Sequence, residues 1–227
     1  MRSWLIPQDR GARAGFWHCI RRRCSVGAIS LIGLLPWAEA ASAKVYWLTV
    51  SIHEELQGSL GEAEVKQILQ TASAIMKYKT GSWTNDCDVE FKLRFPIQFF
   101  NFAPAHIKKA KHLEAVHQVP ADVKVVRKIN YCVGKFDKAG FDGCAWRAGA
   151  RQKTVIVTPV VAAPGNLWVH EFGHTTCLPH RMANQALMTP CPIKHLSWRI
   201  NQAECRHFLA GPRLCRTPDP VVACPTR

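Results

Sequence analysis

Acidic residues are scarce in this chain of 227 residues, and so are the composition biases of non-globular proteins. There are 16 Asp and Glu against 30 Lys and Arg, which gives a formal net charge of +14, and charged residues make up only 20% of the sequence. The 14 Gly and 14 Pro show no bias typical of a disordered, collagenous or low-complexity chain. Because 48% of the residues are hydrophobic, we expect one globular domain, or two small ones, with a real core.

Several motifs are absent as well. Although there are ten cysteines, no two of them form a Cys-x-x-Cys pair, so a thiolate zinc site or a thioredoxin-type redox motif has no support. We find no internal repeat, no linker between domains and no nucleic-acid-binding motif. The basic residues are spread from Lys44 to Arg227 in short clusters, which is typical of a solvated basic surface. We therefore expect no nucleic-acid partner.

A secretory signal peptide is predicted at residues 1–43. Three arginines at positions 21–23 precede an apolar run from Cys24 to Ala38, and the small residues Ala41-Ser42-Ala43 follow shortly before Lys44. The apolar run is short and interrupted by Pro, so it suits a signal peptide better than a membrane span. Cleavage before Lys44 predicts a secreted or periplasmic protein without a stable membrane anchor, and an uncleaved anchor is the alternative.

The segment from Lys44 onward keeps the basic balance and most of the cysteines. Six basic and two acidic residues precede it, so its 184 residues hold 24 Lys and Arg against 14 Asp and Glu, a formal charge of +10. It has eight cysteines, and an even number in an exported protein predicts disulfides. The bond that we expect most strongly joins Cys132 to Cys144 across a Gly-rich turn.

The hydrophobic periodicity predicts an α+β order of strands and helices. Alternating or continuous apolar runs predict five strands, at residues 45–52, 89–95, 123–131, 143–147 and 154–158. Apolar residues at three- and four-residue steps predict a helix that begins at a capping box of Ser59 and Glu62 and ends near Gly81. Three further helices are expected at 105–117, after Pro164-Gly165 with Asn166 as N-cap, and from Asn201 through Phe208 with Glu204 completing a capping box.

Two histidines and a glutamate on the helix expected after Pro164-Gly165 have the spacing of a zinc hydrolase. His170 and His174 are four residues apart, which brings both imidazoles onto one helix face. A catalytic zinc needs three protein ligands and a fourth position for water, and His180, beyond Pro179, can fold back as the third ligand. Glu171 neighbours a ligand without sharing its direction, so it can take a proton from the zinc-bound water and deliver it to the leaving amine.

From Leu167 to Pro190 the sequence resembles the metzincin zinc peptidases. The His-Glu-x-x-His motif, the third His and a downstream Met-turn match the metzincin pattern, and the Ala-Leu-Met-Thr-Pro of residues 186–190 is similar to the matrixin branch. Astacins and serralysins place Tyr two residues after the Met, where this chain has Pro190. Adamalysins follow the third His with Asp, where this chain has Arg181.

The resemblance implies a fold and a domain layout. The fold would be an α+β, metzincin-like zincin domain, in which a mixed, twisted five-stranded sheet carries an active-site helix, a Met-turn and a C-terminal helix. This catalytic domain would cover residues 44–210, after a leader and signal peptide at 1–43 and before a Pro- and Cys-containing tail at 211–227.

The same resemblance implies roles for individual residues. His170, His174 and His180 would bind the catalytic zinc, and Glu171 would be the general base. Met188 would lie beneath the metal as an apolar floor. Residues 143–146 look like the edge strand that metzincins lay antiparallel to an extended peptide substrate.

One residue departs from the metzincin pattern, because Cys177 stands where that pattern has Gly. The Gly usually adopts a positive φ, so an L-residue there should cost about 1 to 2 kcal/mol unless the turn differs. A disulfide from Cys177 to Cys191, just after the Met-turn, is one compensating hypothesis, and Cys87 is an equally open partner.

Further metals are left open. Calcium and a second, structural zinc are common in matrixins, so the resemblance leaves Ca²⁺ as a second cofactor, but Asp137 and Asp142 alone are too sparse to place it. His106, His112 and His117 lie in a Lys-rich segment, where scattered histidines are more often solvated than metal ligands.

The sequence as a whole predicts a secreted zinc-dependent endopeptidase, with a protein or peptide as its substrate. Two alternatives stay open. One is an exported basic protein that binds anionic polymers and has a non-catalytic zinc site, and the other is a zinc-dependent cell-wall amidase or peptidase. Neither the cleavage specificity nor the oligomeric state follows from the sequence.

Overall fold

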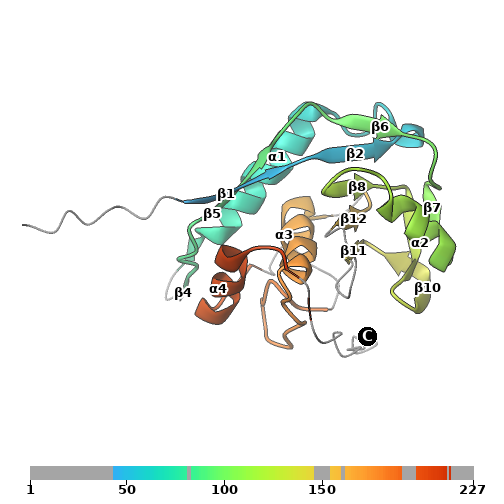
Figure 1. Ribbon diagram of the computed structural model, residues 1–227. Coiled ribbons are helices and arrows are strands. Elements are labelled where there is room, and N and C mark those ends of the chain that lie inside the picture. The colour runs from blue at the N-terminus through green and yellow to red at the C-terminus, as the bar shows by residue number, and fades with distance from the viewer. Residues whose placement is uncertain are drawn as a thin grey trace, which may run out of the picture. The chain divides into compact units, whose positions relative to one another are not determined.

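A mixed five-stranded sheet forms the centre of the computed structural model (Figure 1). The strand order is β11-β12-β8-β2-β6, and the bounds are Gly143–Ala145, Val155–Val157, Val123–Val125, Val50–His53 and Gln98–Phe100. The last four strands are parallel to one another, whereas β11 runs antiparallel to β12 at one edge. The predicted α+β class with a mixed five-stranded sheet is therefore confirmed.

The structure describes residues 43–80, 83–145, 154–159, 162–190, 198–213 and 215. The predicted signal peptide, apart from its last residue, lies outside these ranges, as do Trp146, Cys191 and the tail beyond Cys215. In the part that is described, no helix has both the length and the hydropathy of a membrane span.

Two helices cover one face of the sheet and a third covers the other. Helices α1 (Glu62–Met76) and α3 (Pro164–Thr175) pack on the first face, where the buried valines of β8 and of β12 point. Helix α2 (Ala110–His117) packs on the opposite face, in a second cluster that includes Ile156 of β12. Because side chains alternate along a strand, Ile156 faces away from its two valine neighbours. Figure 1 shows α3 in the centre of the fold, close to β11 and β12.

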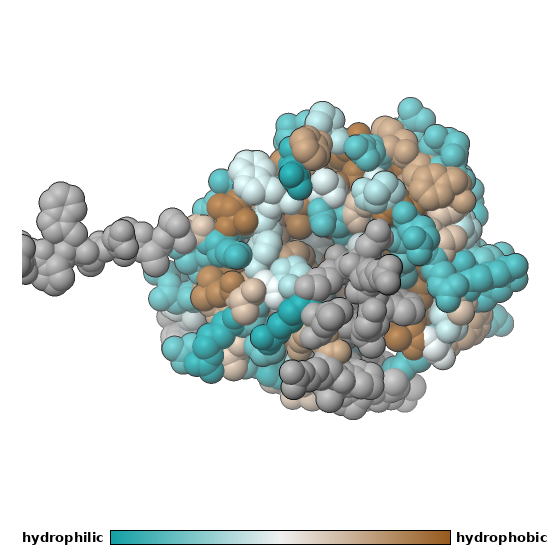
Figure 2. All heavy atoms as spheres, viewed as in Figure 1, coloured by the Kyte–Doolittle hydropathy of each residue, from teal (hydrophilic) through white to brown (hydrophobic). Residues whose placement is uncertain are grey.

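The remaining elements extend these layers. Strands β1 (Lys44–Leu48) and β5 (Val89–Leu93) form a parallel pair that packs on α1. A second small sheet of order β10-β9-β7 lies on the α2 side, and its strands are Lys135–Phe141, Lys128–Cys132 and His106–Ile107. The other elements are η1 (Glu54–Leu56), β3 (Lys79–Thr80), β4 (Trp83–Thr84) and α4 (Gln202–Ala210). On the face drawn in Figure 2, hydrophobic residues form scattered patches among hydrophilic ones.

Two of the predicted strands are each broken in two. The strand expected at 45–52 is interrupted at Thr49, whose backbone N–H and hydroxyl both donate to the carboxylate of Asp122 (2.8 and 2.6 Å). The strand expected at 123–131 is interrupted at Val126 and Arg127, where the backbone N–H groups donate to other segments, namely Val157 and Ala105. As a result β5 pairs with β1 outside the main sheet, and β6 takes its place there.

The helices form where the sequence predicts them, but their first and last residues differ from the prediction. Helix α1 begins two residues later than expected, with Gly61 as N-cap in place of Ser59, because the side chain of Glu64 accepts from the Gly61 N–H and Ser59 instead donates to Leu56. It ends at Met76 rather than near Gly81, since the chain turns into the β3–β4 hairpin. The segment expected as a helix at 105–117 starts as strand β7, with α2 following from Ala110.

The two helices near the predicted metal ligands differ in this respect. Helix α3 starts at Pro164, two residues before the predicted N-cap Asn166, because Pro has no N–H to satisfy in a first turn and its φ already suits the helix. Helix α4 has the predicted capping box, in which Asn201 accepts from the Glu204 N–H at 2.8 Å and Glu204 accepts from the Asn201 N–H at 2.8 Å.

Three disulfides are present among the described residues. The predicted Cys132–Cys144 bond is confirmed and joins β9 to the edge strand β11. The hypothesis that Cys177 pairs with Cys191 or Cys87 is wrong, because Cys177 is bonded to Cys215 and Cys87 to Cys205. The physical reason is a backbone contact, in which the Arg213 N–H donates to the Thr175 carbonyl and brings the chain beyond α4 against the end of α3.

Candidate metal centre

Helix α3 holds two of the predicted ligands in a buried position. Every residue from Gly165 to Thr175 is buried, so this helix is enclosed by protein on all sides. His170 and His174 are 4% and 6% exposed. Since positions four apart lie one above the other on a helix, the two imidazoles project from the same face.

Backbone carbonyls hold the outer nitrogen of both rings. His170 Nδ1 lies 2.8 Å from the carbonyl oxygen of Leu187, and His174 Nδ1 lies 2.9 Å from that of Leu178. A carbonyl oxygen only accepts, so in each pair the ring must donate its Nδ1–H. In the neutral ring this leaves the lone pair on Nε2, which is the form that binds a metal.

The inner nitrogens of three rings converge. His174 Nε2 lies 3.2 Å from His170 Nε2 and 3.1 Å from His180 Nε2, and all three ligand atoms lie within 4.8 Å of one another. Two ligands at 2.0–2.1 Å from a tetrahedral zinc are about 3.3 Å apart, so these separations fit one zinc ion. Three neutral imidazoles are also a donor set that zinc favours. The structure thus brings together all three histidines that the sequence singled out.

A left-handed residue turns the chain from α3 toward the third histidine. The Cys177 N–H donates to the His174 carbonyl and the Leu178 N–H to the Gly173 carbonyl, which is the Schellman arrangement at a helix C-terminus. The position with positive φ in that motif is usually Gly, and here Cys177 occupies it at φ 70°. The expectation that this position needs a positive φ is confirmed, and the chain accepts the strain of an L-residue to reach His180.

Glu171 lies in a closed environment beside the histidines. Its side chain is buried against strand β11, since any Cβ at Gly143 would overlap its carboxylate. Burial, with a smaller contribution from the negative charge of Asp142, raises the pKa of Glu171 to about 8. Gly143 is thus the residue that allows the edge strand to approach the carboxylate this closely.

Met188 and its neighbours lie against the other side of α3. Met188 is fully buried, and its sulfur packs so closely on Gly173 that a Cβ there would be 2.6 Å from it. The carbonyl of Leu187 orients His170, and the carbonyl of Met188 accepts from the Arg181 N–H at 2.8 Å. The predicted Met-turn therefore contacts the ring of His170 and the backbone of the residue after His180.

The other candidate residues do not join a metal site. Within the described ranges, the only group of three or more His, Cys, Asp or Glu side chains that could hold a metal is His170, His174 and His180. The expectation that His106, His112 and His117 are merely solvated is wrong, because each ring is only partly exposed and makes a hydrogen bond.

Sequence reasoning missed the groups that hold the ligands in place. The Leu187 and Leu178 carbonyls carry no sequence signal, because every residue has a carbonyl. The ion pair of Arg181 with Glu204 carries no local signal either, because the two residues are 23 positions apart.

Comparisons with known proteins leave the family open. No protein-family model matches the chain, and no curated protein matches it. Among solved structures, one that matches is metalloproteinase-II from Bacteroides fragilis, with a TM-score of 0.47 and 14% identity over 76% of this chain and 54% of that one. The chain thus spans about half the length of that protein. At this level of similarity the function has to be inferred from the site itself.

Proposed function

We propose that this protein is a zinc-dependent endopeptidase of the matrixin-like metzincin type. The observation that carries the proposal is the convergence of three imidazole nitrogens, on and just beyond a buried helix that also carries the buried carboxylate of Glu171. Such a set of groups has the ligands of a catalytic zinc site, with a fourth position left over, and a residue that can exchange protons.

The protein's own groups divide the work. When bound, zinc would polarise the scissile carbonyl and lower the pKa of a water molecule. His170, His174 and His180 would hold the metal as neutral ligands, with the first two kept in their tautomers by backbone carbonyls. Glu171 would accept the proton of the attacking water at its carboxylate and donate it to the nitrogen of the leaving amine.

Strand β11 offers a place for an extended substrate. It is the edge strand of the sheet, antiparallel to β12, and Gly143 at its start lies against Glu171. A peptide that added to this edge as a further strand would pass its backbone by the carboxylate of Glu171. Sequence-independent backbone pairing of this kind suits an enzyme that cuts within a polypeptide.

The setting fits an exported enzyme. Three disulfides are typical of a protein that matures outside the cytoplasm, which agrees with the secretory signal predicted before Lys44. We propose a secreted or periplasmic enzyme that acts on protein or peptide substrates, with no nucleic-acid partner. Calcium is not assigned to any residue.

The test is cleavage of a diverse peptide library by the purified protein, with and without a zinc chelator and beside Glu171→Ala. We expect chelator-sensitive cleavage that readdition of zinc restores, and a loss of roughly 10²- to 10⁴-fold in kcat for the variant, as for removal of a general base. His112→Ala is the matched control for purification and folding. If the wild type binds zinc yet cuts no peptide, the endopeptidase is wrong, and assays on cell-wall fragments and anionic polymers decide between an amidase and a binding protein.

A further inference from the structure

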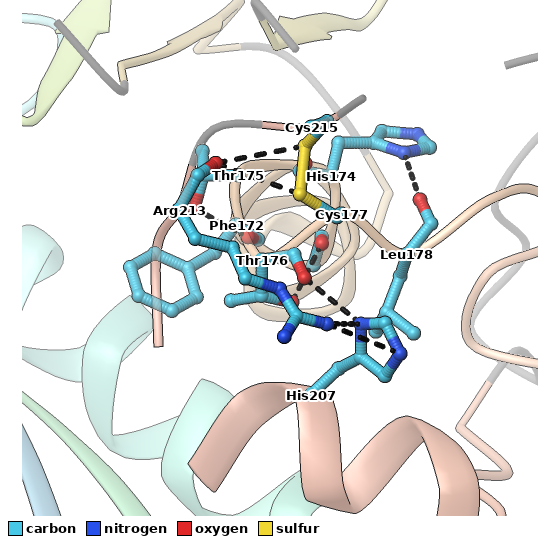
Figure 3. Close-up of a disulfide and its surroundings, with 10 residues drawn as sticks. Phe172, His174, Thr175, Thr176, Cys177, Leu178, His207, Arg213 and Cys215 are labelled. Carbon is cyan, nitrogen blue, oxygen red and sulfur yellow. Dashed lines mark hydrogen bonds between the residues drawn. A yellow bond between two sulfur atoms is a disulfide. The ribbon is translucent and has the colours of Figure 1, made fainter. Parts of the chain in front are cut away.

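The third histidine lies on a short segment that the C-terminal part of the chain holds from both sides. Three residues before His180, Cys177 is bonded to Cys215, which follows α4. Immediately after His180, Arg181 is paired with Glu204 of α4. Figure 3 shows the first of these ties, with the disulfide against the end of α3 and Arg213 beside it.

The ion pair has a fixed geometry. Arg181 Nε donates to Glu204 Oε1 at 2.7 Å, and Arg181 Nη2 donates to Glu204 Oε2 at 2.9 Å. The same Nη2 also donates to the Arg199 carbonyl at 2.9 Å. The Glu204 carboxylate is 7% exposed, and it also accepts from the Asn201 N–H. A bidentate pair with these further bonds restricts the guanidinium to one orientation.

Burying such a pair contributes little net stability, because the charges lose their hydration. Its other effect is geometric. Arg181 is held at its side chain by Glu204 and at its backbone N–H by the Met188 carbonyl. The backbone next to His180 is therefore fixed relative to both α4 and the Met-turn.

The disulfide fixes the other end of the segment. The Arg213 N–H donates to the Thr175 carbonyl at 3.1 Å, and Cys215 then reaches the sulfur of Cys177. Cys177 has a φ of 70°, which an L-residue adopts only at a cost. A covalent tie to a second segment keeps the chain in this turn, which is the turn that leads to His180.

We propose that helix α4 and Cys215 set the metal affinity of the site by positioning His180, with Arg181 and Glu204 as positioning residues and Cys177–Cys215 as the second tie. The inference rests on the proposed function only in naming zinc as the metal. His170 and His174 are held by the rigid helix α3, whereas His180 lies beyond it and depends on these ties.

The experiment measures zinc affinity by competition with a chromophoric chelator for wild type, Arg181→Met, Glu204→Gln and the double variant. We expect each single variant to bind zinc roughly tenfold more weakly, as when groups that orient a ligand are removed, and the double variant to be no weaker than the poorer single variant. Arg181→Lys, which keeps the charge without the bidentate bond, should fall between. Arg127→Met removes an exposed ion pair with Glu55 (3.1 Å) and should leave the affinity unchanged.

A further double variant tests the disulfide without the strain of an L-residue at positive φ. Cys177→Gly with Cys215→Ala removes the tie and places at the left-handed position the residue that prefers it. We expect weaker zinc binding here too, and a changed absorption spectrum when Co²⁺ replaces zinc, which a merely less stable protein would not show. Melting of the metal-free variants, followed by circular dichroism, sets the temperature below which affinities are compared. This double variant also carries the test if Arg181→Met does not fold.

The outcomes separate this inference from the proposed function. If all these variants bind zinc as the wild type does and the Co²⁺ spectrum is unchanged, the positioning role is wrong, even if chelator-sensitive cleavage shows that the enzyme is real. If the variants bind zinc more weakly but the wild type cuts no peptide, the positioning role stands and the endopeptidase does not. A wild type that binds no zinc overturns both.

Discussion

The molecule has two groups of three histidines, on opposite faces of its sheet, and they are arranged differently. His170, His174 and His180 point their Nε2 atoms at one another. On the α2 side, His106 Nε2 lies 2.5 Å from the amide oxygen of Asn130, and the ring nitrogens of the other two histidines bond to different acceptors, namely the His106 carbonyl for His112 and the Thr154 hydroxyl for His117.

The difference lies in which nitrogen the protein occupies and in the charge nearby. In the first group, carbonyls take the outer Nδ1 and leave the inner Nε2 atoms to face a common point. In the second, the partners are spread over β9, β7 and the start of β12. Burial and the positive charge of Lys124 also lower the pKa of His117 to about 4. A place that disfavours a proton on the ring for these reasons disfavours a metal cation as well.

The largest effect is expected from removing one inner nitrogen of the first group. His174 is central, since its Nε2 is near both other rings, so His174→Ala should lower the zinc affinity by more than about 100-fold and abolish cleavage. Chelator competition measures the affinity. The same change in the second group, His112→Ala, should alter the affinity by less than about twofold, and a comparable loss there would remove the distinction between the two groups.

A disulfide connects the α2 side of the sheet to strand β11, and removing it should change zinc binding less than removing a ligand does. Cys132–Cys144 ties β9 of the α2 side to β11 beside Glu171 and closes a loop with a sequence separation of 12. Cys132→Ser with Cys144→Ser should lower the free energy of unfolding by about 3 kcal/mol, measured by urea denaturation. Zinc affinity should hold in this variant, because no ligand lies on β9 or β11; a loss as large as that of His174→Ala would contradict this.

The buried charge near His117 gives a third difference. Lys124 is completely buried, and burial lowers the pKa of its amino group to about 7, against an opposing effect of Asp122. Between pH 7 and 10 the unfolded chain therefore binds more protons at this residue than the folded one, so the wild type should gain stability as the pH rises through that window.

Lys124→Met should be more stable than the wild type by roughly 2 kcal/mol at pH 7 and should lose most of that advantage by pH 10. Urea denaturation of both proteins across this range measures the difference, in which the titration of the other groups cancels. His117 and Asp122 are unchanged in the comparison. A difference that does not shrink as the pH rises would mean that Lys124 is charged in the folded protein at pH 10.

The smallest effects are expected at His106 of the second group. His106→Ala removes the bond to Asn130 and should cost about 1 kcal/mol of stability, the usual net value of one hydrogen bond. Thermal unfolding measures this, and zinc affinity should be unchanged. If His106→Ala weakened zinc binding, the two groups would be coupled through the sheet.

What the sequence could predict about this molecule is local. The ligand spacing on α3 follows from helix geometry, and the α4 capping box from residues three positions apart. The Cys132–Cys144 bond also spans a short segment. In each case the residues involved are close in the sequence, so periodicity and spacing contain the information.

What the sequence could not predict depends on distant partners. The break at Thr49 comes from Asp122, which is 73 positions away, and the partner of Cys177 is set by a backbone contact beyond α4. Likewise, the Arg181–Glu204 pair joins two segments that have no common pattern. Such contacts form only once the layers have packed, so no local signal marks them.

The bond between Cys87 and Cys205 has a consequence for any molecule of this protein whose chain is cut once. These cysteines are 118 positions apart, and the segment between them contains Glu171 and all three histidines. A single cut anywhere in that segment leaves two pieces that are still covalently joined. A molecule nicked there would therefore keep the intact mass but for one added water, and it would separate into two fragments only after reduction.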